Sequence, residues 1–205
     1  MDDSGIVHII DDDAPMRGAL EALFRCVGLA TQSYGSARQF LEAKKEDRVG
    51  CLVVDVRLPG MSGLDFQQQL STLGIKLPVV LMTGHGDIPM SVRAMKAGAV
   101  DFLPKPFRDQ DMLDAVIAAI ERDRTRREAR ESVAAIHRRF ATLSSREREV
   151  LLLVATGKMN KQVAGDLGIT EITVKIHRGG AMRKMGARTF ADLVRMVEVL
   201  KREES

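Results

Sequence analysis

The chain has 205 residues, 45% hydrophobic and 29% charged, which is typical of a globular protein with one or two domains. No apolar run reaches the roughly 20 residues that span a bilayer, and the acidic start MDDSG is atypical of a signal peptide, so we expect a cytoplasmic protein without membrane contact. The two cysteines, Cys26 and Cys51, lie in apolar segments, and we expect buried reduced thiols rather than a disulfide or a metal site.

The charge is distributed unevenly along the chain. Residues 1–120 contain 12 Lys and Arg against 16 Asp and Glu, a net charge of −4, whereas residues 121–205 contain 19 against 12, a net charge of +7. An acidic half joined to a basic half predicts two domains with different partners, and the basic one is a candidate for binding nucleic acid.

The first half alternates between two patterns. Short apolar runs rich in β-branched residues predict strands at 6–10, 29–34, 51–54, 78–82 and 100–103. Each is followed by a segment with helical spacing, at 16–27, 37–45, 64–73, 88–96 and 111–122. Because the strand runs lack period-two alternation, both faces of the sheet should be buried. The pattern predicts an α/β domain over residues 1–122, with a five-stranded parallel sheet between two layers of helices.

The second half contains no strand signal. Residues 123–142 have dense alternating charge and neither Gly nor Pro, which predicts a solvated linker helix. Residues 143–205 contain four sets of helix-start residues, namely Ser144 with Glu147, Asn160, Thr170, and Thr189 with Asp192. Glycines at 157, 168 and 186 end the first three helices. The prediction is an all-α domain of four helices.

Polar residues stand at the ends of four of the predicted strands, namely Asp11, Asp12, Asp55, Thr83 and Lys105. The carboxyl ends of parallel strands meet at one edge of the sheet, so these side chains should converge. A single Asp after a strand is more often a turn or cap residue, but five polar residues on four strand ends are harder to explain in that way. Asp13 differs, because it precedes a helix start with Pro15 in the first turn, and we expect it to be the N-cap.

The chemistry of this set favours a phosphoryl site. Three neighbouring carboxylates resist joint ionisation unless a cation lies among them, and oxygen-only ligands favour Mg²⁺. Lys105 is a fixed cation and Thr83 a hydroxyl donor, and phosphoryl transfer depends on such charge neutralisation and positioning. A carboxylate can itself attack phosphorus to form an aspartyl phosphate, and Asp55 is the candidate.

Four motifs, IIDDD, VVDVRLPGMSG, VVLMTGHGD and AMKAGAVDFLPKPF, resemble the receiver domain of two-component response regulators over residues 5–122. The resemblance implies a flavodoxin-like strand order, 2-1-3-4-5. It also implies a Mg²⁺ site with Asp12 and Asp55 as direct ligands, Asp11 acting through water, and the backbone carbonyl of Arg57 as a further ligand.

The same resemblance assigns roles around that metal. Asp55 would be the phosphoacceptor, and Thr83 and Phe102 would be the switch pair. Lys105 would be the conserved lysine of the family, followed by a cis bond to Pro106. The run TGHGDIPMSVRAMK is similar to FixJ-type receivers, which pair through this face, and His85 within it is expected to be an exposed loop residue rather than a catalytic base.

The segment NKQVAGDLGITEITVKIHRGGAMRKM predicts a helix-turn-helix. Ala164 is small where two helices must cross, and Gly168 allows the turn. The second helix offers a set of polar and basic side chains outward, namely Thr173, Lys175, Arg178, Arg183 and Lys184. A plain basic helical bundle is the alternative, but the complete turn pattern favours DNA binding.

Residues 143–199 also resemble the LuxR-type output domain of the NarL/FixJ subfamily. The resemblance implies phosphate contacts from Thr173, His177 and Arg178, groove reading by Lys175 and Ile176, and dimerisation through the last helix. Two departures are Met159 in place of the usual Ser, and the pair Gly179 and Gly180 in the second helix. Each Gly costs up to about 1 kcal/mol of helix stability relative to Ala, so we expect this helix to order fully only on DNA.

The sequence therefore predicts a response regulator that takes a phosphoryl group from a sensor histidine kinase, forms a homodimer on phosphorylation and binds double-stranded promoter DNA, with RNA polymerase a further partner to consider. It is not expected to be a turnover enzyme. A haloacid dehalogenase-type phosphatase is the enzyme alternative, but such enzymes require an Asp two residues after the nucleophile, where this chain has Arg57. A third alternative is a DNA-binding protein that works without phosphorylation.

Overall fold

The computed structural model describes residues 5–44, 47–84 and 88–203. It divides into two compact units, Met1–Arg127 and Glu128–Ser205. The first unit contains a five-stranded parallel sheet of β1 (Ile6–Ile10), β2 (Ala30–Tyr34), β3 (Gly50–Asp55), β6 (Val79–Thr83) and β7 (Asp101–Pro104). The strands lie in the order β2-β1-β3-β6-β7, which confirms the predicted order 2-1-3-4-5.

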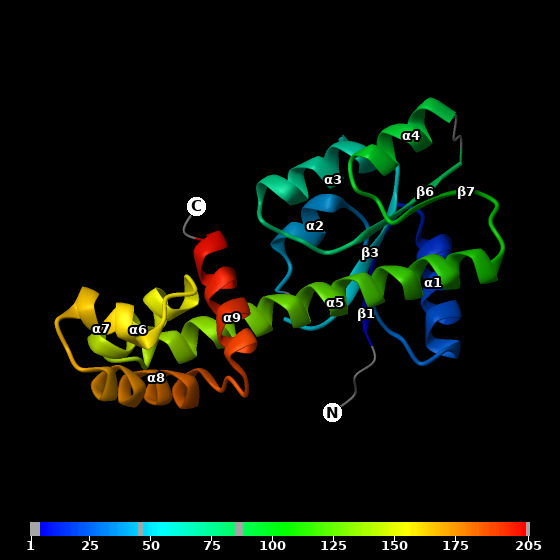
Figure 1. Cartoon of the computed structure of the whole chain (residues 1–205). Coiled ribbons are helices and arrows are strands. Elements are labelled where there is room, and N and C mark those ends of the chain that lie inside the picture. Colours follow the sequence, from blue (N-terminus) through cyan, green and yellow to red (C-terminus); the bar gives the residue numbers. More distant parts are fainter. Residues whose placement is uncertain (1–4, 45–46, 85–87, 204–205) are drawn as a thin grey trace. The chain divides into compact units, whose positions relative to one another are not determined.

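Helices cover both faces of this sheet. They are α1 (Ala14–Cys26), α2 (Ala37–Glu42), α3 (Gly63–Thr72), α4 (Ile88–Lys96) and α5 (Asp109–Ala141). Figure 1 shows α2, α3 and α4 on one side of the sheet and α1 and α5 on the other. Along β1, Val7 and Ile9 pack towards α1 and α5, whereas Ile10 packs towards α2 and α3. Every residue of β1, β3 and β6 is buried, on both faces of the sheet, which explains the missing alternation in these runs.

A small hairpin was not predicted. Strands β4 (Arg57–Leu58) and β5 (Met61–Ser62) pair antiparallel directly after β3. Each has two residues, too few for any periodicity, and Gly60 in the turn between them has a positive φ of 81°. The hairpin places Ser62 as the N-cap of α3, where its Oγ accepts a hydrogen bond from the Asp65 N–H.

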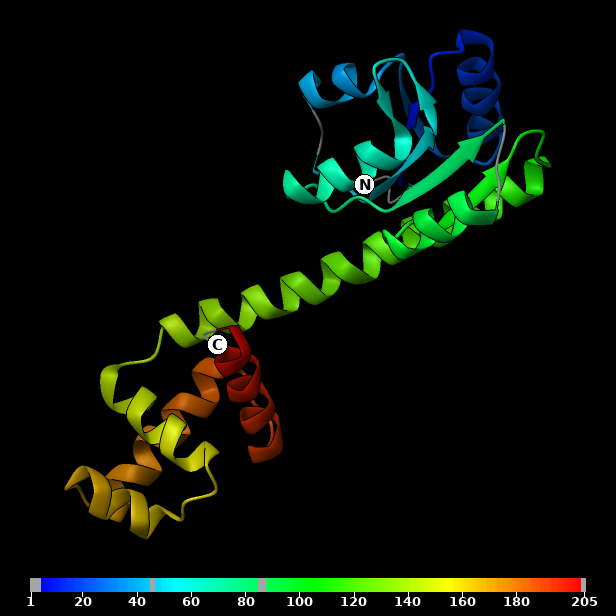
Figure 2. The ribbon, with the colours of Figure 1, turned by 90° about the horizontal axis from the view of Figure 1, so that it is seen from above.

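Helix α5 is longer than the sequence suggested. The segments predicted as a last receiver helix, 111–122, and a separate linker helix, 123–142, form one helix of 33 residues, visible without interruption in Figure 2. It contains neither Gly nor Pro, so nothing in its backbone breaks it. The division between the compact units falls within this helix, after Arg127.

The second unit consists of the last part of α5 with α6 (Ser145–Ala155), α7 (Asn160–Leu167), α8 (Glu171–Met185) and α9 (Phe190–Glu203). Its core includes Val150, Leu151, Val163, Val174, Leu193 and Val197. The Ser144–Glu147 capping box is present, and Thr170 caps α8 as predicted. Thr189 and Asp192 exchange the expected hydrogen bonds before α9.

Asn160 is not the cap that the sequence suggested. It is the first residue of α7, and Met159 holds the N-cap position, where its N–H donates to the Gln162 Oε1 at 2.9 Å. The Gln162 side chain, three residues after Met159, accepts this hydrogen bond from the backbone, so the cap residue itself does not need a polar side chain. Asn160 is thereby free to contact α8 with its side chain.

Of the two thiols, only Cys51 is buried, and burial raises its pKa. Cys26 is exposed, contrary to the prediction, because it ends α1 on the face turned away from the sheet. Both thiols are free. Along the described part of the chain, no helix has the combined length and apolar character needed to cross a bilayer.

Candidate functional site

The three strand-end carboxylates converge at the carboxyl edge of the sheet. Asp11 follows β1 and Asp55 ends β3, and these two strands are neighbours. Carboxylate oxygens of Asp11, Asp12 and Asp55 lie within 4.8 Å of one another. Asp11 is fully buried and Asp55 is 7% exposed, whereas Asp12 faces solvent. The cluster therefore has a closed side and an open side.

Lys105 bridges the two buried carboxylates. Its Nζ donates to the Asp11 Oδ2 and to the Asp55 Oδ2, at 2.8 Å in each case. Burial raises the pKa of the Asp11 carboxyl, although the hydrogen bond from Lys105 opposes this effect. Burial also disfavours the charged lysine, but its hydrogen bonds to both carboxylates outweigh burial and raise the Lys105 pKa. The ammonium thus stays charged beside Asp55.

Three further predicted residues lie on β6, on β7 and directly after β3. Thr83 is fully buried at the end of β6, the strand next to β3, and its carbonyl accepts the Lys105 N–H at 2.6 Å. Phe102 is half-buried on the adjacent strand β7. The Arg57 N–H donates to the Asp55 Oδ1 at 3.0 Å, so the Arg57 main chain lies against the carboxylate. The Lys105–Pro106 bond is cis, as the resemblance implied.

The donor set fits a hard divalent cation. Three carboxylates face a single ammonium, which leaves an excess of negative charge at oxygen ligands only. Mg²⁺ takes such ligands together with water and phosphate oxygens. Asp12, Asp55 and the Arg57 carbonyl are the residues that could hold it.

Asp13 stands directly before α1, at the cap position that was predicted for it. It holds the N-cap position of α1 with an extended backbone, but its side chain makes no capping hydrogen bond. Its N–H instead donates to the Asp11 Oδ1 at 2.8 Å. The backbone of Asp13 therefore orients a carboxylate of the acidic site, and no sequence signal predicted this contact. His85 lies outside the described residues.

The helix-turn-helix is formed by α7 and α8. Gly168 ends α7 in the left-handed conformation, with φ 64°, and Thr170 begins α8 two residues later. Val163, Ala164 and Val174 are buried between the helices. Ala164, the small residue expected where the two helices cross, is buried, with 8% of its surface exposed.

One face of α8 is free of contacts with the core. Ile172 and Ile176, four residues apart, are 71% and 67% exposed, and Lys175 and Arg183 are exposed beside them. Apolar groups of this kind can contact thymine methyls in the major groove. Ile172 was not among the predicted residues, although its spacing of four from Ile176 was a usable signal.

Other α8 side chains that were predicted to contact DNA make contacts within the second unit. The Arg178 Nη1 donates to the Asn160 Oδ1 at 3.3 Å, and its guanidinium lies 5.0 Å from the Phe190 ring centroid. The Lys184 Nζ donates to the Glu147 Oε2 at 2.6 Å rather than pointing freely outward. Thr173 and His177 are half-buried.

The two adjacent glycines of α8 have different surroundings. Helix α8 runs unbroken through both of them, and that it orders fully only on DNA stays a prediction. Gly180 is buried, and a Cβ there would lie 2.5 Å from the Glu147 Oε1. Gly179 is exposed, and a Cβ there would meet nothing within 4 Å. Tertiary packing of the helix outweighs its low propensity.

Comparison with known proteins identifies a family for each of the two domains. Residues 7–117 match the family described as response regulator receiver domain, and residues 141–197 match the bacterial regulatory proteins of the luxR family. Nodulation protein W of Bradyrhizobium diazoefficiens is 60% identical over 195 residues, covering 95% of this chain and 86% of that protein. Transcriptional regulatory protein FixJ of Azorhizobium caulinodans is 43% identical over 196 residues, covering 96% and 93%.

A solved structure agrees over almost the whole chain. The low-resolution structure of the response regulator StyR has 46% sequence identity and a TM-score of 0.85, and the match covers 95% of this chain and 98% of that one. With a receiver domain and a luxR-type helix-turn-helix domain in one chain, this protein belongs to the two-component response regulators of the NarL/FixJ subfamily, which regulate transcription.

Proposed function

We propose that Asp55 accepts a phosphoryl group from a phosphohistidine of a sensor histidine kinase. The observation that carries the proposal is the Asp55 carboxylate at a strand end, bonded to Lys105 and within 4.8 Å of two more carboxylates. An Asp55 oxygen forms a bond to phosphorus while the bond from phosphorus to the histidine nitrogen breaks, and that nitrogen keeps the electron pair. Lys105 neutralises charge on the phosphoryl oxygens as they approach.

Mg²⁺ would be held by Asp12, Asp55 and the Arg57 carbonyl, with Asp11 acting through water, and it would supply further charge neutralisation. Thr83 and Phe102 would form the switch. A phosphoryl group on Asp55 adds acceptor oxygens that attract the Thr83 hydroxyl, and the half-buried Phe102 ring then moves inward. The outer surface of α4 and β7 changes as a result.

That surface is the proposed dimer face. Ile88, Val92 and Met95 on α4 are 81%, 44% and 48% exposed, and together they form an apolar patch. In a dimer two output domains would bind one duplex, with half-sites about one helical turn apart. Lys175 and Ile176 would read the groove, and the flanking residues Thr173, His177, Arg178 and Arg183 would contact phosphates, whereas Lys184 is bonded to Glu147. RNA polymerase is a further proposed contact.

We do not propose a turnover enzyme. A phosphatase with an Asp nucleophile would need an acid and base two residues on, and that position is Arg57, whose side chain is exposed. The chain would take part only in its own phosphorylation and dephosphorylation.

The central test is intact mass after incubation with acetyl phosphate and Mg²⁺. We expect the unmodified chain to gain one phosphate and Asp55→Asn to gain none. Equal labelling of both proteins, or labelling of neither, would contradict the proposal that Asp55 accepts the phosphoryl group.

A matched pair of neighbouring variants tests the metal assignment. Asp12→Asn should abolish Mg²⁺-dependent labelling, because it removes an exposed carboxylate of the cluster. Asp13→Asn should leave labelling intact, because only the backbone of Asp13 contacts the cluster. The reverse result would overturn the assignment.

A further inference from the structure

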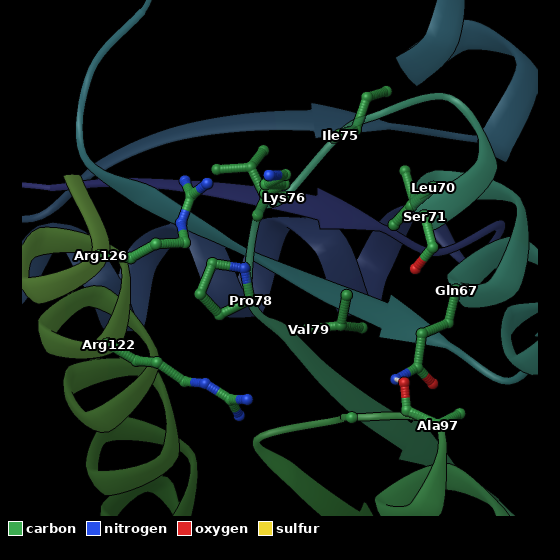
Figure 3. Close-up of a pocket in the computed structure, with 12 residues that line it drawn as sticks. Gln67, Leu70, Ser71, Ile75, Lys76, Pro78, Val79, Ala97, Arg122 and Arg126 are labelled. Carbon is green, nitrogen blue, oxygen red and sulfur yellow. Dashed lines mark hydrogen bonds between the residues drawn. The ribbon is translucent and has the colours of Figure 1, made fainter. Parts of the chain in front are cut away.

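A cavity of about 290 Å³ lies in the first unit at the opposite end of β6 from Thr83. Pro78 and Val79 stand at the start of β6 and line its base (Figure 3). Further apolar side chains line it, namely Leu70, Ile75 and Leu77. The residues that line the cavity include none of the acidic site, so binding in the cavity can be tested apart from the proposed phosphorylation.

Three cations line this cavity. Arg122 and Arg126 extend from α5 on one side of it, one helical turn apart, and Lys76 comes from the segment before β6 (Figure 3). Arg126 donates through its Nε and Nη2 to the Asp123 Oδ1. Within the described residues, neither Arg122 nor Lys76 forms an ion pair. Positive charge is therefore in excess around a partly apolar hollow, where a reduced dielectric strengthens attraction for an anion.

The opposite wall is polar but uncharged. Gln67 is 5% exposed, and its Nε2 donates to the Ala97 carbonyl at 3.0 Å, which fixes the side chain. The Gln67 Oε1 is buried and accepts no hydrogen bond from the described residues. An ionised carboxylate has no proton to donate to this oxygen, so the contacts to an anion come from the cations on the other side and not from Gln67. Ser71 lines the cavity beside it.

We propose that this cavity binds a compact organic dianion with a short hydrocarbon body, such as a dicarboxylate. A guanidinium recognises a carboxylate through two parallel hydrogen bonds, which a lysine cannot provide, and Arg122 is available for this contact. The second carboxylate lies near Lys76 and the remaining Arg126 nitrogen, and the apolar side chains contact the hydrocarbon. The volume of about 290 Å³ is just below the roughly 300–1,000 Å³ typical of ligand pockets, which excludes large ligands.

Backbone amide NMR of the full chain tests the proposal, with succinate as probe and without Mg²⁺ or acetyl phosphate. Saturable shifts are expected at Lys76, Leu77, Ala97 and Gly98. Acetate, with one charge, and inorganic phosphate, without hydrocarbon, should bind about tenfold more weakly at equal ionic strength. No saturable shift, or equal binding of acetate or phosphate, would overturn the proposal whether or not Asp55 is phosphorylated.

Two charge-matched variants complete the test. Arg122→Gln should weaken succinate binding by about tenfold or more, the loss expected for a charge-assisted hydrogen bond. Arg130→Gln removes the same charge from an exposed residue of the same helix outside the cavity, and should change binding less than about twofold. Equal losses of succinate affinity in the two variants would show that net charge alone causes the effect, and would contradict a specific binding site in the cavity.

Discussion

Gly180 and Gly179 are adjacent in α8, but only Gly180 is required by packing. The Glu147 carboxylate beside Gly180 accepts hydrogen bonds from the Ser144 N–H at 2.7 Å and the Lys184 Nζ at 2.6 Å. An added Cβ at Gly180 would displace this carboxylate and break those bonds, whereas one at Gly179 meets open space.

Alanine substitutions should therefore have opposite effects at the two positions. Gly180→Ala should lower the free energy of unfolding by about 1–3 kcal/mol, the usual cost of overpacking. Gly179→Ala should raise it by up to about 1 kcal/mol, since Ala is the better helix former. Urea denaturation followed by circular dichroism measures both. Effects of the same sign would show that helix propensity or packing alone governs the pair.

Glu147 also makes the stability of the second unit depend on pH. The hydrogen bond from Lys184, together with that from the Ser144 backbone, lowers the Glu147 pKa to about 2, from an ordinary value of 4.5. The ionised Glu147 carboxylate therefore adds to the free energy of unfolding of the second unit. This stabilisation is fully present above about pH 4.5 and is lost as the pH falls towards 2.

Replacing Glu147 should remove that dependence. We expect Glu147→Gln to be less stable than the unmodified chain near neutral pH, and the difference in unfolding free energy to shrink as the pH falls through this range. Urea titrations at several pH values measure the difference. Glu149→Gln, on the exposed side of the same helix, should have little effect throughout. A difference that stays constant down to pH 2 would contradict the assignment.

At the scale of elements, α5 is fastened to the sheet by one buried carboxylate. Asp123 is fully buried, and its Oδ2 accepts the Gly50 N–H at 3.1 Å and the Arg127 Nε at 2.8 Å. Its Oδ1 accepts hydrogen bonds from Arg126. The sequence placed Asp123 in a solvated linker, because an acidic residue among alternating charges gives no indication of burial.

Removing this carboxylate should loosen the first unit. Asp123→Ala should lower its free energy of unfolding by about 3 kcal/mol, since it leaves the Gly50 N–H and Arg126 without their acceptor and leaves Arg127 with Asp47 alone. Asp114→Ala, at an exposed position of the same helix, should cost much less. Urea denaturation again provides the measurement, and equal losses would mean that helix propensity rather than the buried contact is responsible.

At the scale of the whole molecule, the proposed function requires phosphorylation to change the assembly state. Acetyl phosphate with Mg²⁺ should double the molar mass from 22.6 kDa, measured by light scattering. Val92→Asp places a charge in the α4 patch and should block the doubling without preventing labelling. Leu73→Asp alters an apolar residue after α3 that is 52% exposed, against 44% for Val92, and should leave the doubling unchanged. A dimer that forms without phosphate, or persists in Val92→Asp, would contradict the proposed face.

The sequence predicted the features that depend on local pattern. Continuous apolar runs followed by helical spacing predicted the parallel sheet, and strand-end positions alone placed Asp11, Asp55 and Lys105 together, because parallel strands share one carboxyl edge. Capping boxes predicted the starts of α6 and α9. These signals involve residues close in sequence, or a convergence that the topology makes unavoidable.

Only the tertiary structure decided which polar side chains bond to other parts of the protein and which face solvent. Lys184 bonds to Glu147, 37 residues away, and Asp123 bonds to Gly50, 73 residues away. The burial of Gly180 and the exposure of Cys26 likewise depend on which face of a helix meets another element. A charged residue at a helix surface has the same local pattern whether its partner is solvent or a distant side chain, so such contacts are determined by packing and not by periodicity.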